Sequence, residues 1–577
     1  MPVSIEPRQG AKKRVAVVGS GLAGLTAAHF LQKGGWQAEL FEKGSAVGMD
    51  AGSLTVEDVR VDVPFRVFTP DYYPYLYSMY RYLGIEFAAA DYSLGFSRAG
   101  QSIWSYTNFN IGGHVVPIPD NVVNGGKRLE ITSDWVRLGF ACLRLMRMPN
   151  MLLCGGLKHM TTAEYLEGEG YGREFIDHVF LPFMASLLTC SLRAAAEYPA
   201  NTVLHFFGKV VFGAHVRKAS GGVQIVCQAL TQGLRRIHLN AHVDKIEVLA
   251  ENNIVITNDG KQHHFDALVL ATPADTAAAL LGKCFVGSSI KYPPMELLQA
   301  VRSVPYEDAT VYTHRDTCVM PKEKSNWHAV NLCTAPGCDR VMASHWINRV
   351  EQSSSGRVLK GPLFQTVDPL QKLDGVVSST HFHRSLVTVD SQARINAIHR
   401  YQGKGGIWLV GTYTAPGVPL LEGCVRTALE VVQAMGVDLP FEPPHLFRRS
   451  PKTGAPYEVG LAPGMTRGEV VEAHFECDTA GTFDFTCPPL TALLKALGAR
   501  GWRSGVSEWL YAFLMWTAWK FALPALVLLL AAADALLCSA LGPDRGARVQ
   551  AVALETMVYI MCVALGLFRK AASVVGS

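Results

Sequence analysis

The sequence predicts an α/β protein with three parts: a Rossmann-like domain for a dinucleotide, an α+β domain inserted into it, and apolar helices towards the C-terminal end. Three observations lead to this prediction. A glycine-rich loop joins an apolar strand to a helix between Arg14 and Lys43. Strands of buried character recur far downstream, at residues 266–273 and 406–413. Long apolar stretches follow residue 507.

Size and composition limit the possible classes. The 577 residues suffice for two or three domains. A net charge of +4 is too small to indicate nucleic acid, and no such partner is expected. The thirteen cysteines include no CxxC pair, which favours reduced thiols in a cytosol-facing protein, and no metal site is expected. Hydrophobic residues reach 49%, which is high for a soluble enzyme, and the excess lies near the C-terminal end.

The glycine loop follows the apolar run Val15–Val18 and leads into a helix. Gly19 permits a tight turn, and Gly21 lets a pyrophosphate approach the backbone. Gly24 allows the helix to pack closely on the strand. The loop therefore predicts a dinucleotide site, against the alternative of a glycine turn without a ligand.

The start of the helix and the end of the next strand complete this site. Leu22 and Ala23 lie in the glycine loop before the predicted helix Leu25–Gln32, whose N-terminus supplies free N–H groups and a partial positive charge to the phosphates. The strand Ala38–Phe41 ends on Glu42, whose carboxylate would accept hydrogen bonds from ribose hydroxyls and would repel a 2′-phosphate. Lys43, next to Glu42, is also expected to contact the cofactor. NADP is thus disfavoured, while NAD and FAD both remain possible on this segment.

A downstream segment favours FAD. Residues 406–413 read as a buried strand ending at Gly411, and an amphipathic helix follows with Glu422, Gly423 and Cys424 near its start. This segment resembles the C-terminal flavin-binding segment of the flavin-containing amine oxidase and phytoene desaturase superfamily. The resemblance implies that Gly411 passes close to the ribityl chain. It also implies that the helix N-terminus faces the flavin pyrimidine ring and stabilises negative charge there.

Two intervening segments fit the same resemblance. Residues 266–273 resemble the strand and loop that return to the nucleotide domain, ending on Thr272 and Pro273. Residues 241–246 resemble the strand whose backbone meets the adenine, with Val243 as the contact. Three separated segments that build one site imply FAD as the cofactor.

A narrower resemblance covers residues 12–435. It is to a branch of predicted FAD/NAD(P)-binding, amine-oxidase-like proteins that accompany lipid modification of the cyclopropane-fatty-acid type. The stretches that carry it are Val61–Phe65, Tyr73–Leu76, Leu83–Ile85, Phe180–Ala185, Thr313–Asp316, Met320–Pro321 and His345–Arg349. The branch implies an acyl lipid, or another hydrophobic small molecule, as the substrate class.

The chain departs from the amine-oxidase pattern at three places. Residues 47–53 lack the arginine that the superfamily places near the pyrophosphate. Pro64 stands where a glycine is expected, and residues 383–385 read His-Arg-Ser in place of a His-Pro element. These departures leave the catalytic residues unassigned. Candidates for lining the substrate pocket are Tyr413, His314, His345 and Trp346.

Domain limits follow from these segments. The FAD-binding domain is expected in three parts, the substrate domain in two, then a Pro-rich extension and a membrane hairpin. The FAD-binding domain covers residues 12–99, 221–275 and 401–437, and the substrate domain covers 100–220 and 276–400. The Pro-rich extension covers 438–506, and the membrane hairpin covers 507–570.

Two regions suggest contact with a membrane. Residues 521–541 and 549–568 are apolar and are joined by a Gly-Pro-Asp-Arg-Gly turn, which predicts a hairpin that spans the bilayer. Basic residues on both flanks predict an intracellular membrane protein with its FAD domain in the cytosol. Asp534 and Glu555 would be costly inside the bilayer, so a pair of helices that lie on the bilayer is the alternative to spanning. Residues 136–148 place three arginines on one helical quadrant, as in an interfacial helix or a core helix with a solvated edge.

The first hypothesis is therefore a membrane-tethered FAD-dependent oxidoreductase that oxidises or desaturates an acyl-lipid-like substrate by hydride transfer to flavin N5. A flavin-dependent double-bond isomerase of a lipid is the second. Amine oxidation and a non-catalytic, FAD-stabilised scaffold are the others. The sequence identifies neither the electron acceptor nor the membrane.

Overall fold

The computed structural model describes residues 13–441, except for gaps at 112–113, 120–125, 148–155, 212–215, 251–252, 287–292 and 351–358, and also residues 447–449 and 456–458. The predicted hairpin at 507–570 and nearly all of the 438–506 extension lie outside these residues. Within the described part of the chain, no helix is both long enough and apolar enough to cross a bilayer.

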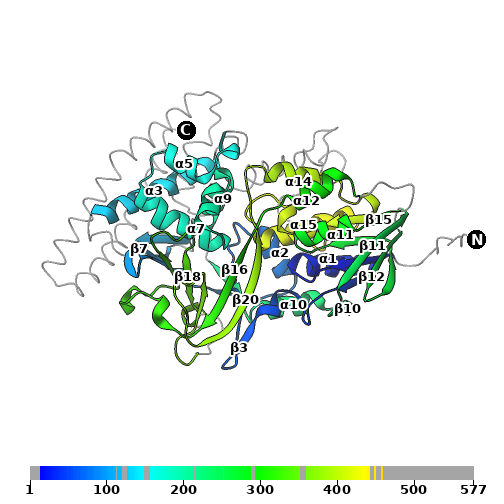
Figure 1. Cartoon of the computed structure of the whole chain (residues 1–577), viewed down its shortest axis with the longest axis horizontal. Helices are drawn as coiled ribbons and strands as arrows, with labels where there is room; N and C mark the ends of the chain where they lie inside the picture. Colours follow the sequence, from blue (N-terminus) through cyan, green and yellow to red (C-terminus); the bar gives the residue numbers. More distant parts are fainter. Residues whose placement is uncertain are drawn as a thin grey trace, which may run out of the picture.

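A parallel five-stranded sheet forms the centre of the nucleotide-binding domain (Figure 1). Its strands, in spatial order, are β10 (Arg236–His238), β2 (Gln37–Phe41), β1 (Arg14–Val18), β14 (Ala267–Leu270) and β21 (Ile407–Leu409). The order brings together three stretches of sequence that are separated by long insertions. The discontinuous nucleotide-binding sheet predicted from the sequence is present.

Both faces of this sheet are covered, which explains its continuous apolar strands. Val15 and Val17 point into a core that they share with three helices, while Ala16 and Val18 point into a second core on the other face. The helices of the first core are α1 (Leu22–Lys33), α10 (Val223–Thr231) and α15 (Leu421–Ala434). The other face packs against a small sheet and three further helices. These are β11 (Val243–Ala250), β12 (Asn253–Asn258), β13 (Lys261–Phe265), β15 (Phe285–Val286), α11 (Ala274–Gly282), α12 (Met295–Arg302) and α14 (Ser391–Arg400).

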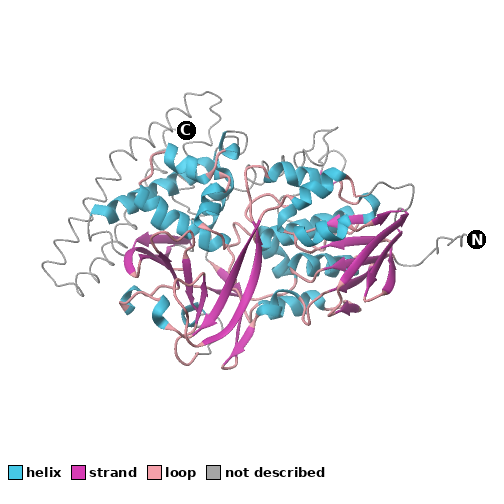
Figure 2. Cartoon of the chain, viewed as in Figure 1, coloured by secondary structure: helices cyan, strands magenta, loops and turns pink. Residues whose placement is uncertain are grey.

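The second domain is an eight-stranded sheet with helices packed against one end (Figure 2). The strands, in spatial order, are β20 (Val376–Ser385), β16 (Tyr306–His314), β19 (Phe364–Val367), β18 (Met342–Trp346), β17 (Val330–Thr334), β6 (Leu94–Arg98), β7 (Gln101–Ile111) and β8 (His114–Pro119). The helices are α3 (Gly126–Arg147), α5 (Thr162–Gly168), α6 (Arg173–Phe175), α7 (Leu181–Leu188), α8 (Leu192–Glu197) and α9 (Ala200–Val211). Because β6 belongs to this sheet, the second domain begins before residue 100.

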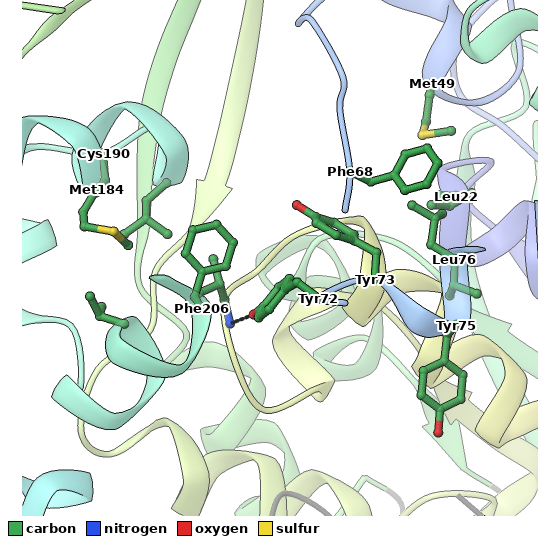
Figure 3. Close-up of a cluster of buried hydrophobic side chains, with 14 of the residues drawn as sticks. Leu22, Met49, Phe68, Tyr72, Tyr73, Tyr75, Leu76, Met184, Cys190 and Phe206 are labelled. Atoms are coloured by element: carbon green, nitrogen blue, oxygen red, sulfur yellow. Dashed lines mark hydrogen bonds between the residues drawn. The ribbon is translucent and has the colours of Figure 1, made fainter. Parts of the chain in front are cut away.

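Shorter elements complete the described part of the chain. They are α2 (Pro74–Tyr82) and the strand pairs β3 (Leu54–Val56) with β4 (Val59–Val61), β5 (Phe87–Ala89) with β9 (Arg217–Ala219), and β22 (Phe447–Arg449) with β23 (Pro456–Glu458). A continuous layer of buried side chains also runs from Leu22 of α1, through Phe68 and Tyr73, to Phe206 of α9 (Figure 3). The Tyr72 ring centroid lies 4.7 Å from that of Phe206. The nucleotide-binding and substrate domains thus share one hydrophobic core.

Helix α3 contains the arginines considered for a membrane surface. Ile131, Trp135 and Leu138 are buried against the rest of the domain. The Arg137 guanidinium lies 4.4 Å from the centroid of the Tyr171 ring and donates to the backbone carbonyls of Gly170, at 3.1 Å, and Glu169. Of the two interpretations, these contacts favour a core helix, since Arg137 is engaged by protein groups.

Candidate cofactor site

The glycine loop has the geometry that the sequence predicts. Gly19 has φ +101°, and a Cβ there would lie 2.7 Å from the carbonyl oxygen of Ala271. A Cβ at Gly24 would lie 1.9 Å from the Gly19 carbonyl oxygen. Gly21 precedes α1 with an ordinary φ of −59°, and nothing lies within 4 Å of a Cβ there. The start of α1 therefore faces open space, and its first N–H groups can bind an anion.

Glu42 lies at the carboxyl end of β2, as predicted, and also braces the loop. Its Oε2 accepts hydrogen bonds from the Ser20 N–H at 2.9 Å and the Ser20 hydroxyl at 2.6 Å, and its Oε1 accepts from the Gly44 N–H at 2.7 Å. Each carboxylate oxygen has further acceptor capacity, so a ribose contact is compatible with these bonds. The neighbouring Lys43 side chain is exposed.

The second segment reaches the same loop. Ala271 donates its N–H to the Val18 carbonyl, and a Cβ on Gly19 would lie 3.4 Å from the Thr272 nitrogen. Pro273 follows as the exposed N-cap of α11. The Ala241 N–H donates to the Glu42 carbonyl at 2.8 Å, which places the buried Val243 at the start of β11, close to the end of β2. The structure thus brings the predicted adenine and pyrophosphate contacts together.

The third segment closes on the start of α1. Gly411 follows β21 with φ +138°, and its N–H donates to the Thr427 hydroxyl at 3.1 Å. A Cβ on Gly423 would lie 3.3 Å from Ala415 Cβ. Burial raises the pKa of the Cys424 thiol to about 11, opposed by two arginines and by the backbone N–H groups of Thr412 and Ala23. Cys424 therefore lies where the first turns of α1 and α15 meet.

Glu422 has a role that sequence reasoning missed. Its Oε1 accepts from the Tyr75 N–H at 2.9 Å, and its Oε2 accepts from the Leu76 N–H at 3.0 Å. Both groups are N–H groups that the first turn of α2 leaves without intrahelical partners. Glu422 thus caps α2 from a distant segment, and its predicted contact with the cofactor stays a prediction.

Two arginines in the site were also missed as functional residues. Arg66 follows the loop Asp62–Phe65, which Gln365 fixes by donating to the Asp62 carbonyl at 2.7 Å and accepting from the Phe65 N–H at 2.8 Å. Arg384 lies near the end of β20. The Nε atoms of both arginines are buried and have no hydrogen-bond partner among the described residues. The missing arginine at 47–53 was the only hint in the sequence that others would be needed.

The four candidate pocket residues do not form one pocket wall. Tyr413 is buried beside Gly411, where a Cβ would lie 3.3 Å from its ring. His345 pairs with Gln365, and its ring centroid lies 5.8 Å from that of Phe65. Burial lowers the pKa of His345 to about 4, so this ring is neutral at pH 7. Tyr413 therefore lies beside the third cofactor segment, and His345 lies beside the Asp62–Phe65 loop.

His314 and Trp346 lie elsewhere. Both pair with Phe364 across the sheet, one residue out of step with the pairing of His345, so they point to the opposite face. The His314 Nε2 lies 2.8 Å from the Thr366 hydroxyl, and the Trp346 ring packs at 5.3 Å against Trp327. The structure gives these two side chains places in the sheet's packing and does not bring them to the glycine loop.

A cleft of about 300 Å³ opens close to the third segment. It is lined by Asn201 and Thr202 of α9, by residues 387–393 with Ile395 and Asn396, and by the stretch Ala415–Gly417. The wall includes apolar side chains, such as Val387 and Ile395, and polar ones. This cleft lies where the substrate domain meets the segment that follows Gly411.

Comparisons with known proteins agree with this architecture. A family model described as an NAD(P)-binding Rossmann-like domain matches residues 17–83. No curated protein sequence matches the chain. Among solved structures, wild-type putrescine oxidase bound to putrescine is similar, with 16% identity, coverage of 74% of this chain and 99% of that one, and a TM-score of 0.51.

Two further structures have the same coverage of 74% and 99%. Cyclohexylamine oxidase from Brevibacterium oxydans shows 14% identity and a TM-score of 0.52. A CLA-producing fatty acid isomerase from P. acnes shows 14% identity and a TM-score of 0.51. These likenesses confirm, at the level of the fold, the predicted similarity to the flavin amine oxidases.

Proposed function

We propose that this chain is an FAD-dependent oxidoreductase that acts on a hydrophobic, acyl-lipid-like substrate. The observation that carries the cofactor assignment is the convergence of three distant segments on the open start of α1. Gly19 abuts Ala271, and Cys424 faces the N–H groups of Ala23 and Thr412. A nucleotide cofactor that is held along its whole length requires such a composite site.

The site fits FAD. The α1 N-terminus and Gly21 would receive the diphosphate, Glu42 the ribose, and the strand at Val243 the adenine. Gly411 and the N-terminus of α15 would lie against the flavin end. When bound, FAD supplies a group that accepts hydride from a C–H bond of the substrate. The protein residues position that bond and exclude water.

The acidic groups at the site argue against a cationic amine as substrate. Glu42 and Glu422 direct both carboxylate oxygens to groups of the protein, and Asp62 accepts from the Val223 N–H at 3.0 and 3.1 Å. These carboxylates already accept hydrogen bonds from the protein, whereas a cationic amine needs a counter-charge and a neutral lipid does not.

An anaerobic titration tests the reaction class. The full chain, loaded with FAD, would be mixed with liposomes of an unsaturated phosphatidylcholine, with the free fatty acid, and with putrescine and cyclohexylamine as amine probes. Bleaching of the visible flavin spectrum by a lipid, but not by the amines, is the expected result. Bleaching by the amines alone would refute the lipid proposal.

A lipid double-bond isomerase is the second candidate, because the fatty acid isomerase shares this fold. In that case the flavin spectrum would return unchanged while the geometry or position of the double bond alters, which gas chromatography of the lipid shows. FAD binding with neither outcome would indicate a scaffold.

A matched pair of glycine variants tests whether the site is needed. Gly21→Asp places a carboxylate at the open start of α1, where a Cβ meets nothing within 4 Å, so the fold is left intact. Gly168→Asp is the control, because this exposed glycine also has free space around it. A deletion strain and the Gly21→Asp strain should share one change in lipid composition that the control strain lacks.

Membrane attachment through residues 521–541 and 549–568 is part of the proposal, on the strength of their apolar sequence. Flotation of the full chain with liposomes measures it. Leu528→Arg, which places a charge in the first segment, should shift the protein from the vesicle fraction to the soluble fraction. Unchanged flotation would contradict insertion of this segment.

A further inference from the structure

Arg66 and Arg384 are enclosed charges whose Nε atoms no described group satisfies. Both Nε atoms are buried without a hydrogen-bond partner, and neither guanidinium has an ion pair within the described residues. The contact of Arg384 is with the Phe382 ring, whose centroid lies 4.9 Å from its Cζ. An enclosed cation without a counter-charge is costly, so the folded protein needs an anion there.

The two arginines repel each other. Burial and, to a smaller extent, the charge of Arg66 lower the pKa of Arg384 to about 10. Burial also lowers the pKa of Arg66, and Asp62 opposes that effect. However, both Asp62 oxygens accept from the Val223 N–H at the start of α10, so this carboxylate is shared with a helix terminus. Among the described residues, the two guanidinium charges face one carboxylate, that of Asp62.

Cys424 places the pair next to the phosphate-binding end of α1. Its thiol interacts with both guanidinium groups and with the N–H of Ala23, which lies in the first turn of α1. Arg66, Arg384 and Cys424 are each closely surrounded by protein, and each keeps part of its surface accessible. Two guanidinium groups and a helix N-terminus therefore converge on one position.

We propose that Arg66 and Arg384 together bind the diphosphate of FAD, in place of the arginine that this chain lacks at residues 47–53. Each guanidinium can offer paired N–H donors to one phosphate, and their two charges match those of the diphosphate. This assignment rests on the proposed function only in taking FAD as the ligand. It adds two residues that come from a loop and from the substrate domain's sheet.

FAD titration of the stripped full-length protein tests the assignment. Arg66→Gln and Arg384→Gln should each weaken FAD binding by at least about tenfold, which corresponds to about 1.4 kcal/mol. Riboflavin, which lacks phosphates, should bind all variants alike. Arg60→Gln is the matched control, since this nearby guanidinium bonds to the Thr55 hydroxyl and should leave both affinities unchanged.

Thermal unfolding separates ligand binding from a structural role. Without FAD, each single variant should melt at or above the wild-type temperature, because one of two repelling cations is gone. With FAD, the gain in melting temperature should be smaller than in the wild type. Arg66→Lys, which keeps the charge but loses the planar donors, should bind FAD with intermediate affinity.

Three results would overturn the assignment: unchanged FAD affinity in both variants, an equal loss of riboflavin affinity, or a lower melting temperature of the variants without FAD. If a variant keeps its FAD affinity but loses the spectral change that a lipid induces, the two arginines bind an anionic substrate. That result would also refute the assignment to the diphosphate. If the wild type binds FAD normally but no lipid alters its spectrum, the proposed substrate fails while this assignment stands.

Discussion

The carboxylate of Glu422 holds the N-terminus of α2 by accepting a hydrogen bond from the Tyr75 N–H at 2.9 Å, across 347 residues of sequence. A second bond, from the Leu76 N–H at 3.0 Å, makes this a two-point cap. Helix α2 packs against α15, so the cap fixes the aromatic stretch of Tyr72 and Tyr73 relative to the third cofactor segment. At this point the domains are therefore linked by hydrogen bonds as well as by apolar packing.

Glu422→Gln should destabilise the protein by about 1–3 kcal/mol, because one carboxylate oxygen becomes an NH₂ that faces a backbone N–H. Urea denaturation of wild type and variant measures the difference. Glu167→Gln, which removes a pair with Arg173 that is largely exposed, should change stability far less. Equal effects of the two substitutions would show that the cap contributes no more than a surface charge.

Gly24→Ala and Gly21→Ala should both weaken FAD binding but should differ in their effect on stability. At Gly24 a Cβ would lie 1.9 Å from a backbone carbonyl, so the β1–α1 unit must distort and both stability and FAD binding should fall. At Gly21 a Cβ meets no atom, so stability should stay within roughly 1 kcal/mol of wild type while FAD binding weakens. Melting curves with and without FAD report both quantities. Equal stability of the two variants would contradict the close packing of α1 on the loop.

His345 should make stability fall with acid. Burial lowers its pKa from 6.5 to about 4, so between these values the unfolded chain binds a proton that the folded chain does not. Stability should decrease as pH falls from 6.5 to 4, by at most about 3 kcal/mol, with no further loss from this group below that range. His345→Asn should flatten this part of the profile in chemical denaturation at several pH values. The substitution His242→Asn, at an exposed position, serves as control, and an identical profile in all three proteins would contradict the prediction.

Arg137→Gln distinguishes the two interpretations of α3. The arginine lies over the Tyr171 ring and bonds to the Gly170 carbonyl, so its loss should cost about 1 kcal/mol of stability. Liposome flotation of the full chain should be unchanged. Loss of flotation at unchanged stability would restore the interfacial helix.

The sequence was sufficient wherever a function depends on local backbone geometry. Gly19, Gly21, Gly24 and the acid after β2 are read within one strand–loop–helix–strand unit, and the structure places them as predicted.

What the sequence could not predict depends on tertiary contacts. The partners of Glu422 and Gln365 lie about 300 residues or more away. A shift of one residue along a strand reverses the side chain's direction, which separates His345 from Trp346 although they are neighbours. Arg66 and Arg384 meet only because the loop and the edge strand converge, and no local pattern marks either of them.

The contact between Cys424 and the start of α1 has a consequence for biosynthesis. The ribosome completes the glycine loop early, yet the N–H of Ala23 receives its thiol neighbour only when α15 has emerged. Until then α2 lacks its cap from Glu422, and the two arginines lack the remaining walls of their enclosure. A nascent chain that stops before residue 421 should therefore fail to retain FAD, so cofactor capture has to follow the synthesis of α15.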